Sequence, residues 1–191
     1  MRIISGIFGG RAIQMNGKLP IRPTSDKARG AVFSSLAPHI DGARFLDICA
    51  GTGAMGLEAL SRGALLVKAI ERSQEAAHLI RANRQALGTT GASFDVIVGE
   101  FSKILPRMAG ESFDIIFADP PYGKGYPSEI LILVELYSLL APGGHLVIEH
   151  FTKEQVLAAP GSLRLTRTKK YGQTQMSFFI LDQPKEPGGA K

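Results

Sequence analysis

Short apolar runs alternate with helix-length amphipathic segments from residue 44 onward. The runs are rich in β-branched and aromatic side chains, and the segments between them repeat apolar residues at helical spacing. Strands that alternate with helices are typical of βα units around a parallel sheet, so the pattern predicts an α/β fold. The predicted strands cover residues 45–49, 65–70, 94–98, 113–118 and 145–149, and the predicted helices cover 54–62, 73–87, 101–108 and 128–140.

Polar and turn-forming residues mark where several of these helices begin and end. Ser73 is placed to cap the helix over 73–87, and Gly88 to end it. The sequence Pro142-Gly143-Gly144 is expected to close the helix over 128–140 and to turn the chain into the strand at 145.

The two ends of the chain have a different pattern. Residues 1–15 carry β-branched residues around Gly9-Gly10 and predict a hairpin with Arg2 and Arg11 on its surface. A loop over 20–26 follows, and Ser25 is the expected N-cap of the next helix. That helix is predicted to end near Leu36 and to bury three apolar side chains, those of Val32, Phe33 and Leu36.

Near the C-terminus, two β-rich segments flank Tyr171-Gly172. Residues 163–170 and 173–181 predict an antiparallel hairpin added to the edge of the sheet, and residues 182–191 are a polar tail that we expect to be flexible. The chain therefore divides into an N-terminal extension over 1–40, a main domain over 41–181 and this tail.

The composition of the 191 residues is that of an ordinary globular protein, with 45% hydrophobic residues. The most apolar window, 130–136, is interrupted by Glu135 and is far shorter than the roughly 20 residues of a membrane span. No secretory signal is recognisable over 1–6. The single cysteine, Cys49, cannot form an internal disulfide, so we expect a cytoplasmic protein in which Cys49 packs within a strand.

The formal net charge of +5 is unevenly distributed. Residues 1–44 hold seven basic and two acidic residues, whereas residues 45–191 hold fifteen of each. A solvated basic face and a surface for a polyanionic partner are both compatible with this excess. A second basic cluster, Arg164, Arg167, Lys169 and Lys170, lies near the C-terminus.

A glycine loop, defined here as Gly51 to Gly56, joins a predicted strand to a predicted helix. Its G-x-G-x-x-G spacing is typical of nucleotide-binding folds, and NAD would be the first ligand to consider. Asp47, however, precedes the loop on the same strand. A carboxylate there would repel a pyrophosphate and attract an ammonium or sulfonium group, which favours S-adenosylmethionine over NAD.

Two more acidic residues stand where predicted strands end. Glu71 follows the second strand and could bind ribose hydroxyls, because open α/β sheets bind ligands at the carboxyl ends of their strands. Glu100 follows the third strand. A surface acid remains the alternative for Glu71, and a helix cap or a surface acid for Glu100.

The chemistry is expected at the DPPY turn, defined here as Asp119 to Tyr122, which follows the fourth predicted strand. Proline has no N–H group and a restricted φ, so the turn is rigid and rich in acceptors. Asp119 and the Pro120 carbonyl could accept the hydrogens of an exocyclic amine while Tyr122 stacks on its ring. Asp119 could then take the proton after methyl transfer, and the alternative is a strand-ending turn without chemistry.

No other catalytic constellation competes with these two motifs. The four histidines are scattered, no metal-ligand spacing is recognisable, and neither a nucleophile elbow nor a phosphate-binding loop of the P-loop type is present. We therefore expect no metal.

The sequence resembles the RsmD family of bacterial 16S rRNA guanine methyltransferases. The resemblance is carried by Met1 to Gly6 with Gly10-Arg11, by Arg22 to Lys27, by Leu46 to Ala64 with its glycine loop, and by the DPPY turn. It spans residues 1 to about 181. One departure is Gly30, where relatives often have glutamate, and it concerns helix stability rather than the active site.

This resemblance implies a Rossmann-like, S-adenosylmethionine-dependent methyltransferase domain with a seven-stranded, mostly parallel sheet and an RNA-contacting N-terminal extension. The implied substrate is the 2-amino group of a guanine in 16S rRNA or a small-subunit assembly particle, and the chain is expected to act as a monomer. The implied catalytic residues are Asp119, Pro120, Pro121 and Tyr122; the cofactor-binding residues are Asp47, Ala50, Gly51, Thr52, Gly53, Glu71, Arg72, Glu100, Phe101 and Asp119; the RNA-binding residues are Arg2, Arg11, Arg22, Thr24 and Lys27.

Several alternatives stay open at this point. The same turn serves amino-methyltransferases that act on DNA adenine or on protein glutamine, although the glutamine enzymes usually carry Asn where Asp119 stands. A cofactor-binding RNA chaperone with incidental methyl transfer is a third possibility. The segment Arg22 to Ser25 either folds over the cofactor, positions the base, or serves only as the start of a capped helix.

Overall fold

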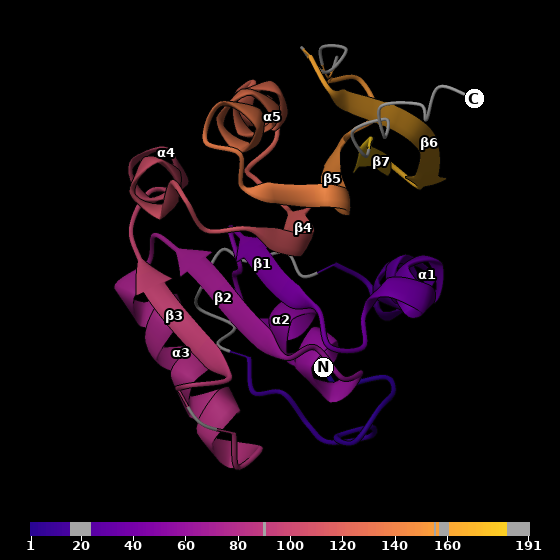
Figure 1. Ribbon diagram of the computed structural model, residues 1–191. Helices are drawn as coiled ribbons and strands as arrows, with labels where there is room; N and C mark the ends of the chain where they lie inside the picture. Colours follow the sequence, from indigo (N-terminus) through magenta and orange to yellow (C-terminus); the bar gives the residue numbers. More distant parts are fainter. Residues whose placement is uncertain (16–23, 90, 155, 157–160, 183–191) are drawn as a thin grey trace, which may run out of the picture.

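The computed structural model contains one seven-stranded sheet with helices on both faces (Figure 1). It describes residues 1–15, 24–89, 91–154, 156 and 161–182. The strand order is β3-β2-β1-β4-β5-β7-β6. The strands are β1 Arg44–Ile48, β2 Leu66–Glu71, β3 Phe94–Val98, β4 Phe113–Ala118, β5 Leu140–Phe151, β6 Leu163–Tyr171 and β7 Thr174–Leu181.

β1 to β5 are parallel to one another, and β7 runs antiparallel to both of its neighbours, β5 and β6. β1 pairs with β2 and with β4, β7 lies antiparallel to β5, and β6 lies antiparallel to β7. The predicted α/β fold and the predicted C-terminal hairpin are both confirmed. The hairpin turns at Gly172, whose φ of 65° lies in the left-handed region that glycine tolerates.

Two hydrophobic cores lie on opposite faces of this sheet. α1, α2 and α3 cover one face, where Val32, Leu57 and Ile80 are fully buried. α4 and α5 cover the other face with Ile104 and Ile130. The helices are α1 Asp26–Leu36, α2 Ala54–Ser61, α3 Gln74–Ala86, α4 Phe101–Ile104 and α5 Tyr126–Leu136, with short 3-10 helices at Ala37–His39 and Leu105–Met108.

The predicted helix caps are present. The hydroxyl oxygens of Ser25 and Ser73 accept hydrogen bonds of 3.2 Å from the N–H groups of Ala28 and Ala76, at the first turns of α1 and α3. The inward face of α1 is also confirmed, since Val32, Phe33 and Leu36 are buried.

Residues 1–15 fold back on themselves without forming two regular strands. Arg2 and Ala12 make an isolated antiparallel bridge, where the sequence predicted a hairpin. The reason is that the backbone of this segment is bound by α2: the amides of Ile4 and Ser5 donate to the buried carboxylate of Glu58 at 2.7 and 3.1 Å. Residues 1–15 therefore pack against α2.

Two helix predictions need correction. The helix expected over 101–108 is a single α turn followed by a 3-10 helix that carries Pro106 in its first turn, because proline cannot donate within an α-helix. The helix expected to reach residue 140 ends at Leu136, and Ser138 adopts a left-handed φ of 51°. Pro142 to Gly144 lie within β5, in the irregular stretch between Leu140 and His145 where the register against β4 shifts and Gly143 has a left-handed φ of 77°.

Some predictions concern residues that the structure does not describe. Arg22 and the tail over 183–191 lie outside the described residues. The division into an extension, a main domain and a tail stays a prediction. Among the described helices, none is long and apolar enough to cross a membrane.

Candidate active site

A pocket opens at the carboxyl ends of the central parallel strands. It has a volume of about 480 Å³, within the range of small-ligand sites. β1 lies between β2 and β4: the chain continues from β1 to β2 and β3 on one side of the sheet, and then crosses to β4 and β5 on the other side. Open α/β sheets bind ligands at such a topological switch point. The glycine loop lies on one side of the pocket and the DPPY turn on the other.

The glycine loop folds as its spacing predicts. Gly51 and Gly53 have φ values of 56° and 74°, in the left-handed region, and Gly53 is the N-cap residue of α2. A Cβ atom on Gly56 would come within 2.8 Å of Phe94 and 2.9 Å of Val67, so this glycine lets α2 approach the sheet. Of the proposed cofactor residues in the loop, Gly51 and Thr52 line the pocket, whereas Gly53 supports α2.

Asp47 lies at the floor of the pocket with its side chain buried. Its Oδ2 atom accepts a hydrogen bond of 3.0 Å from the N–H group of Gly56. Burial raises the pKa of Asp47 to about 7, although that hydrogen bond acts in the opposite direction. A cation that enters the pocket would stabilise the ionised form of this carboxyl group. The ammonium and sulfonium groups of S-adenosylmethionine are such cations.

Glu71 binds the backbone on the glycine-loop side of the pocket. Its two carboxylate oxygens accept hydrogen bonds of 2.8 Å, one from the Gly51 N–H group and one from the Ser73 N–H group. Glu71 thereby joins the glycine loop to the start of α3 while it lines the pocket. Each oxygen retains acceptor capacity, so the expected contact with ribose hydroxyls is compatible with this role.

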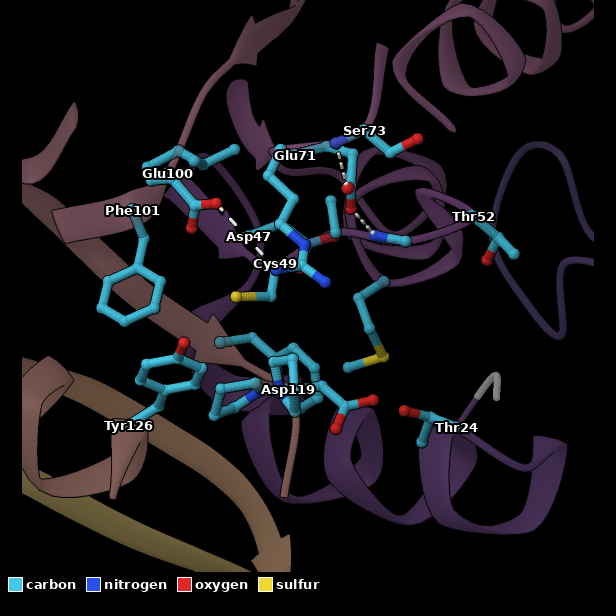
Figure 2. Close-up of a pocket in the computed structure, with 18 of the residues that line it drawn as sticks. Thr24, Asp47, Cys49, Thr52, Glu71, Ser73, Glu100, Phe101, Asp119 and Tyr126 are labelled. Carbon is cyan, nitrogen blue, oxygen red and sulfur yellow. Dashed lines mark hydrogen bonds and ion pairs between the residues drawn. The ribbon is translucent and has the colours of Figure 1, made fainter. Parts of the chain in front are cut away.

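One end of the pocket is lined by an ion pair and by a pair of aromatic rings. Arg72 and Glu100 approach each other to 3.9 Å, and Glu100 makes no side-chain cap for α4. The rings of Phe101 and Tyr126 are 5.3 Å apart in an edge-to-face arrangement. Figure 2 shows both rings at the opposite end of the pocket from Thr24. All four residues line the pocket, and a planar base fits between such groups.

The DPPY turn is held against the central strands. The N–H group of Asp119 donates to the Ile48 carbonyl at 3.3 Å, which ties the turn to the end of β1. The carboxylate of Glu154 accepts from the Gly123 and Gly125 amides at 3.4 and 3.2 Å, just after the turn. Pro120, Pro121 and Tyr122 all line the pocket.

A second carboxylate lies behind the turn. Glu149 lies near the C-terminal end of β5, and it is buried. The hydroxyl of Tyr122 lies 3.4 Å from both Asp119 and Glu149, and the Thr24 hydroxyl donates to Glu149 at 2.8 Å. Burial and the neighbouring charges of Glu149 and Asp47 hold the pKa of Asp119 well above its usual range. In Figure 2, the carboxylate of Asp119 points toward the neighbouring Thr24, whose side chain hydrogen-bonds with it.

Sequence reasoning did not select three residues of this site. Glu149 ends a predicted strand, as Glu71 and Glu100 do, so the same strand-end argument would have found it. Tyr126 carried no motif. Cys49 does not pack within a strand as expected: it follows β1 with a left-handed φ of 63° and lines the pocket, and burial raises the pKa of its thiol.

The proposed RNA-binding residues fall into two groups. Thr24 lines the pocket, and Lys27 is exposed on the first turn of α1 beside it. Arg2 and Arg11 are also exposed but lie with the N-terminal segment, which contacts the end of α2 at Ser61 and the end of α3 at Leu87, away from the glycine loop.

The charge excess of the first 44 residues is partly internal. Arg29 is fully buried; it contacts the Arg2 carbonyl, forms an ion pair of 3.0 Å with Asp26 and lies 3.7 Å from Glu58. This arginine therefore fastens the N-terminal segment to α1 and α2 and is not available to a partner.

Comparisons with known proteins agree with this geometry. The family model described as conserved hypothetical protein 95 matches residues 1–180. Ribosomal RNA small subunit methyltransferase D of Escherichia coli is 33% identical over 179 residues, which cover 94% of this chain and 89% of that protein.

Two solved structures extend the comparison. The structure of yhhF from Escherichia coli, assigned as a methyltransferase, has a TM-score of 0.85 and 30% identity and covers 96% of this chain and 99% of that one. SMU.776, also assigned as a methyltransferase and complexed with SAH, has a TM-score of 0.64 at 14% identity, covers 78% of this chain and 48% of that one, and shares the fold.

The match of the family model over almost the whole chain covers both motifs of the pocket. The relatives in the comparison are methyltransferases by name. This chain belongs to the conserved hypothetical protein 95 family, the RsmD family of rRNA methyltransferases, and has the fold of S-adenosylmethionine-dependent methyltransferases.

Proposed function

We propose that this protein transfers a methyl group from S-adenosylmethionine to the exocyclic 2-amino group of a guanine in 16S rRNA of the small ribosomal subunit. The observation that carries the proposal is the position of the DPPY turn across one pocket from the glycine loop and Asp47. One side of the pocket suits a cationic adenosyl ligand, and the other presents acceptors for an amine.

The cofactor side uses residues of three strand ends. Asp47 would compensate the positive charge of the donor, the Gly51 and Thr52 backbone would lie against it, and Glu71 would accept from ribose hydroxyls. Arg72, Glu100 and Phe101 surround the position expected for adenine, and Ala50 lies beside the loop. When bound, S-adenosylmethionine supplies a methyl group that its sulfonium makes electrophilic.

The substrate side orients and activates the amine. Asp119 and the Pro120 carbonyl accept its two hydrogens, so the nitrogen lone pair is directed toward the methyl group and drawn out of conjugation with the ring. Tyr122 offers its ring for stacking, and Phe151 lies 6.3 Å behind it in a stacked arrangement. After transfer, the nitrogen carries one proton too many, and Asp119 accepts it, as its raised pKa favours.

The hydrogen-bonding edge of guanine matches the acceptors of such a site better than the edge of adenine does. Guanine presents donors at N1 and at the 2-amino group, whereas adenine presents an acceptor at N1. The two oxygens of an ionised Asp119 can accept both guanine hydrogens, because a carboxylate is an acceptor only. The target base would be flipped, or already splayed, into the pocket.

Methyl transfer to defined substrates tests the proposal. The protein is incubated with labelled S-adenosylmethionine and with 30S particles from cells that lack the corresponding methyltransferase, or with a 16S transcript or DNA. Mass mapping is expected to find N2-methylguanosine in the 16S RNA. Label confined to DNA adenine or to protein glutamine would overturn the proposal. An Asp119→Ala variant that loses methylation but keeps its cellular function would favour an RNA chaperone.

A further inference from the structure

Most basic residues of β6 lie toward the end of this strand that is in register with Glu149, near the active site. β6 is the last strand of the sheet, and residues 164–170 on it are all exposed. Four of these seven residues are basic: Arg164, Arg167, Lys169 and Lys170.

The strand register connects this edge strand to Glu149. Glu149 pairs with Met176 of β7, and Met176 pairs with Lys169 of β6. Directly paired residues of antiparallel strands point to the same face, so Glu149, Met176 and Lys169 form one row on the face that carries α1. Two strand spacings correspond to roughly 10 Å between the Cα atoms of Glu149 and Lys169.

The neighbouring positions extend the basic surface around this row. Lys170 belongs to the next row, with Gln175 and His150, and points to the other face. Arg167 lies on the face of Lys169, with its guanidinium 4.2 Å from the centre of the Phe178 ring. Stacking on Phe178 limits the conformations of the Arg167 side chain.

These three cations have no ionic partner within the described part of the chain. None of its carboxylates forms an ion pair with Arg167, Lys169 or Lys170. Arg164 differs: it lies at the opposite end of β6, in the row of His145, and forms an ion pair of 2.7 Å with Asp182. The uncompensated charge of β6 is therefore concentrated at the end near the active site.

We infer that Arg167, Lys169 and Lys170 form a contact surface for the RNA backbone that flanks the target nucleotide. The inference rests on the proposed function and adds a docking surface that the N-terminal extension does not supply. RNA affinity depends mainly on cations that displace counterions from phosphates. An RNA strand that enters the pocket from the β5 side passes this surface, whereas Arg2 and Arg11 lie at the far ends of α2 and α3.

Protection of the sheet edge is the competing explanation, because lysines on an edge strand discourage pairing with another chain. Charge of either sign gives this protection. A Lys169→Glu/Lys170→Glu variant therefore keeps the protected edge, and it leaves the stacking of Arg167 on Phe178 intact, while it repels phosphate.

Binding of a fluorescent 16S transcript, measured by anisotropy over a series of KCl concentrations, tests the inference. The Lys169→Glu/Lys170→Glu variant is expected to bind at least about tenfold more weakly at 0.15 M salt. In a triple Gln variant of Arg167, Lys169 and Lys170, the slope of log affinity against log salt is expected to decrease by about 2. S-adenosylmethionine affinity is expected to be unchanged, and Arg164→Gln is the matched control on the same strand.

The outcomes separate this surface from the reaction. RNA affinity within about twofold of the wild type in the charge-reversal variant, or an equal loss in Arg164→Gln, overturns the surface. Because the assay measures binding alone, the surface stands if the variants lose affinity while the wild-type protein fails to methylate 16S RNA, and only the proposed reaction is then lost. Circular dichroism melting of each variant must match the wild type, and the triple Gln variant gives a second reading if charge reversal alters the fold.

Discussion

Thr24 donates a hydrogen bond of 2.8 Å to Glu149, which lies 125 residues later in the chain. This bond brings the N-terminal end of α1 to the end of β5, directly beside the DPPY turn. Tyr122 shares the same carboxylate and also approaches Asp119. Two carboxyl groups, one hydroxyl and one phenol thus form a continuous polar network behind the proposed position of the amine, and its charge state bears on the reaction.

Neutralising Glu149 is expected to shift the pH dependence of methyl transfer. The negative charge of Glu149 is one of the causes that raise the pKa of Asp119, after burial. In Glu149→Gln the pKa of Asp119 therefore falls, and the acidic limb of the kcat/KM profile should move to lower pH. Asp95→Asn, at an exposed position on β3, is the control. An unchanged acidic limb would show that the ionisation of Asp119 does not determine the rate.

Removing the Asp119 carboxylate is expected to abolish most of the activity. Asp119→Ala loses both the acceptor that orients the amine and the group that takes its proton, which together correspond to a decrease in kcat of about 10²- to 10⁴-fold. Single-turnover methyl transfer measures this effect. Titration with S-adenosylmethionine in the same variant is expected to show a much smaller change, and an equal loss of cofactor binding would contradict the division of the pocket into two sides.

S-Adenosylmethionine binding is expected to depend on pH through Asp47. The pKa of Asp47 is about 7 in the folded protein, so this carboxyl is largely protonated at pH 5.5 and gains its charge as the pH rises. The α-amino group of the ligand stays charged over this range, because its ordinary pKa is near 7.7 to 8.0. Calorimetry is therefore expected to show tighter binding at pH 7 than at pH 5.5. Asp47→Asn should flatten this dependence, and a variant with the wild-type profile would exclude Asp47 as its origin.

The same group affects folding with a defined sign. Its folded-state pKa lies above the ordinary value of 3.8, so between about pH 4 and pH 7 the folded protein holds more protons than the unfolded chain. The contribution of Asp47 to the free energy of unfolding is present below this window and is lost as the pH rises through it. Urea unfolding of the wild type and of Asp47→Asn at pH 5 and pH 7 should show a smaller loss in the variant.

Two glycine substitutions are expected to change stability in opposite directions. In Gly56→Ala the added methyl group would meet Phe94 at 2.8 Å and Val67 at 2.9 Å, which corresponds to a destabilisation of about 1–3 kcal/mol. In Gly30→Ala the new Cβ atom finds only Ile4 at 3.7 Å, and alanine is the better helix former, so unfolding should cost about 0.5–1 kcal/mol more. Chemical denaturation measures both, and equal effects would contradict the role of Gly56 in helix packing.

Local patterns in the chain were sufficient for most of the fold. Alternating strands and helices, the caps at Ser25 and Ser73, the C-terminal hairpin, the glycine loop and the DPPY turn each depend on residues close in sequence, and each is present as predicted. Local patterns failed at Ser138, where a left-handed residue ends α5 early, and in residues 1–15, where Glu58 of a distant helix binds the backbone.

The sequence by itself determined the βα architecture and the two motifs that face each other across the pocket, because hydrophobic periodicity and turn chemistry act over a few residues. Only the tertiary structure decided that Glu149 meets Thr24 and Tyr122, that Arg29 is buried, and that Lys169 lies in the row of Glu149. The physical reason is the order of the strands: β7 lies between β5 and β6, and this pairing brings together side chains whose positions in the sequence give no sign of their contact.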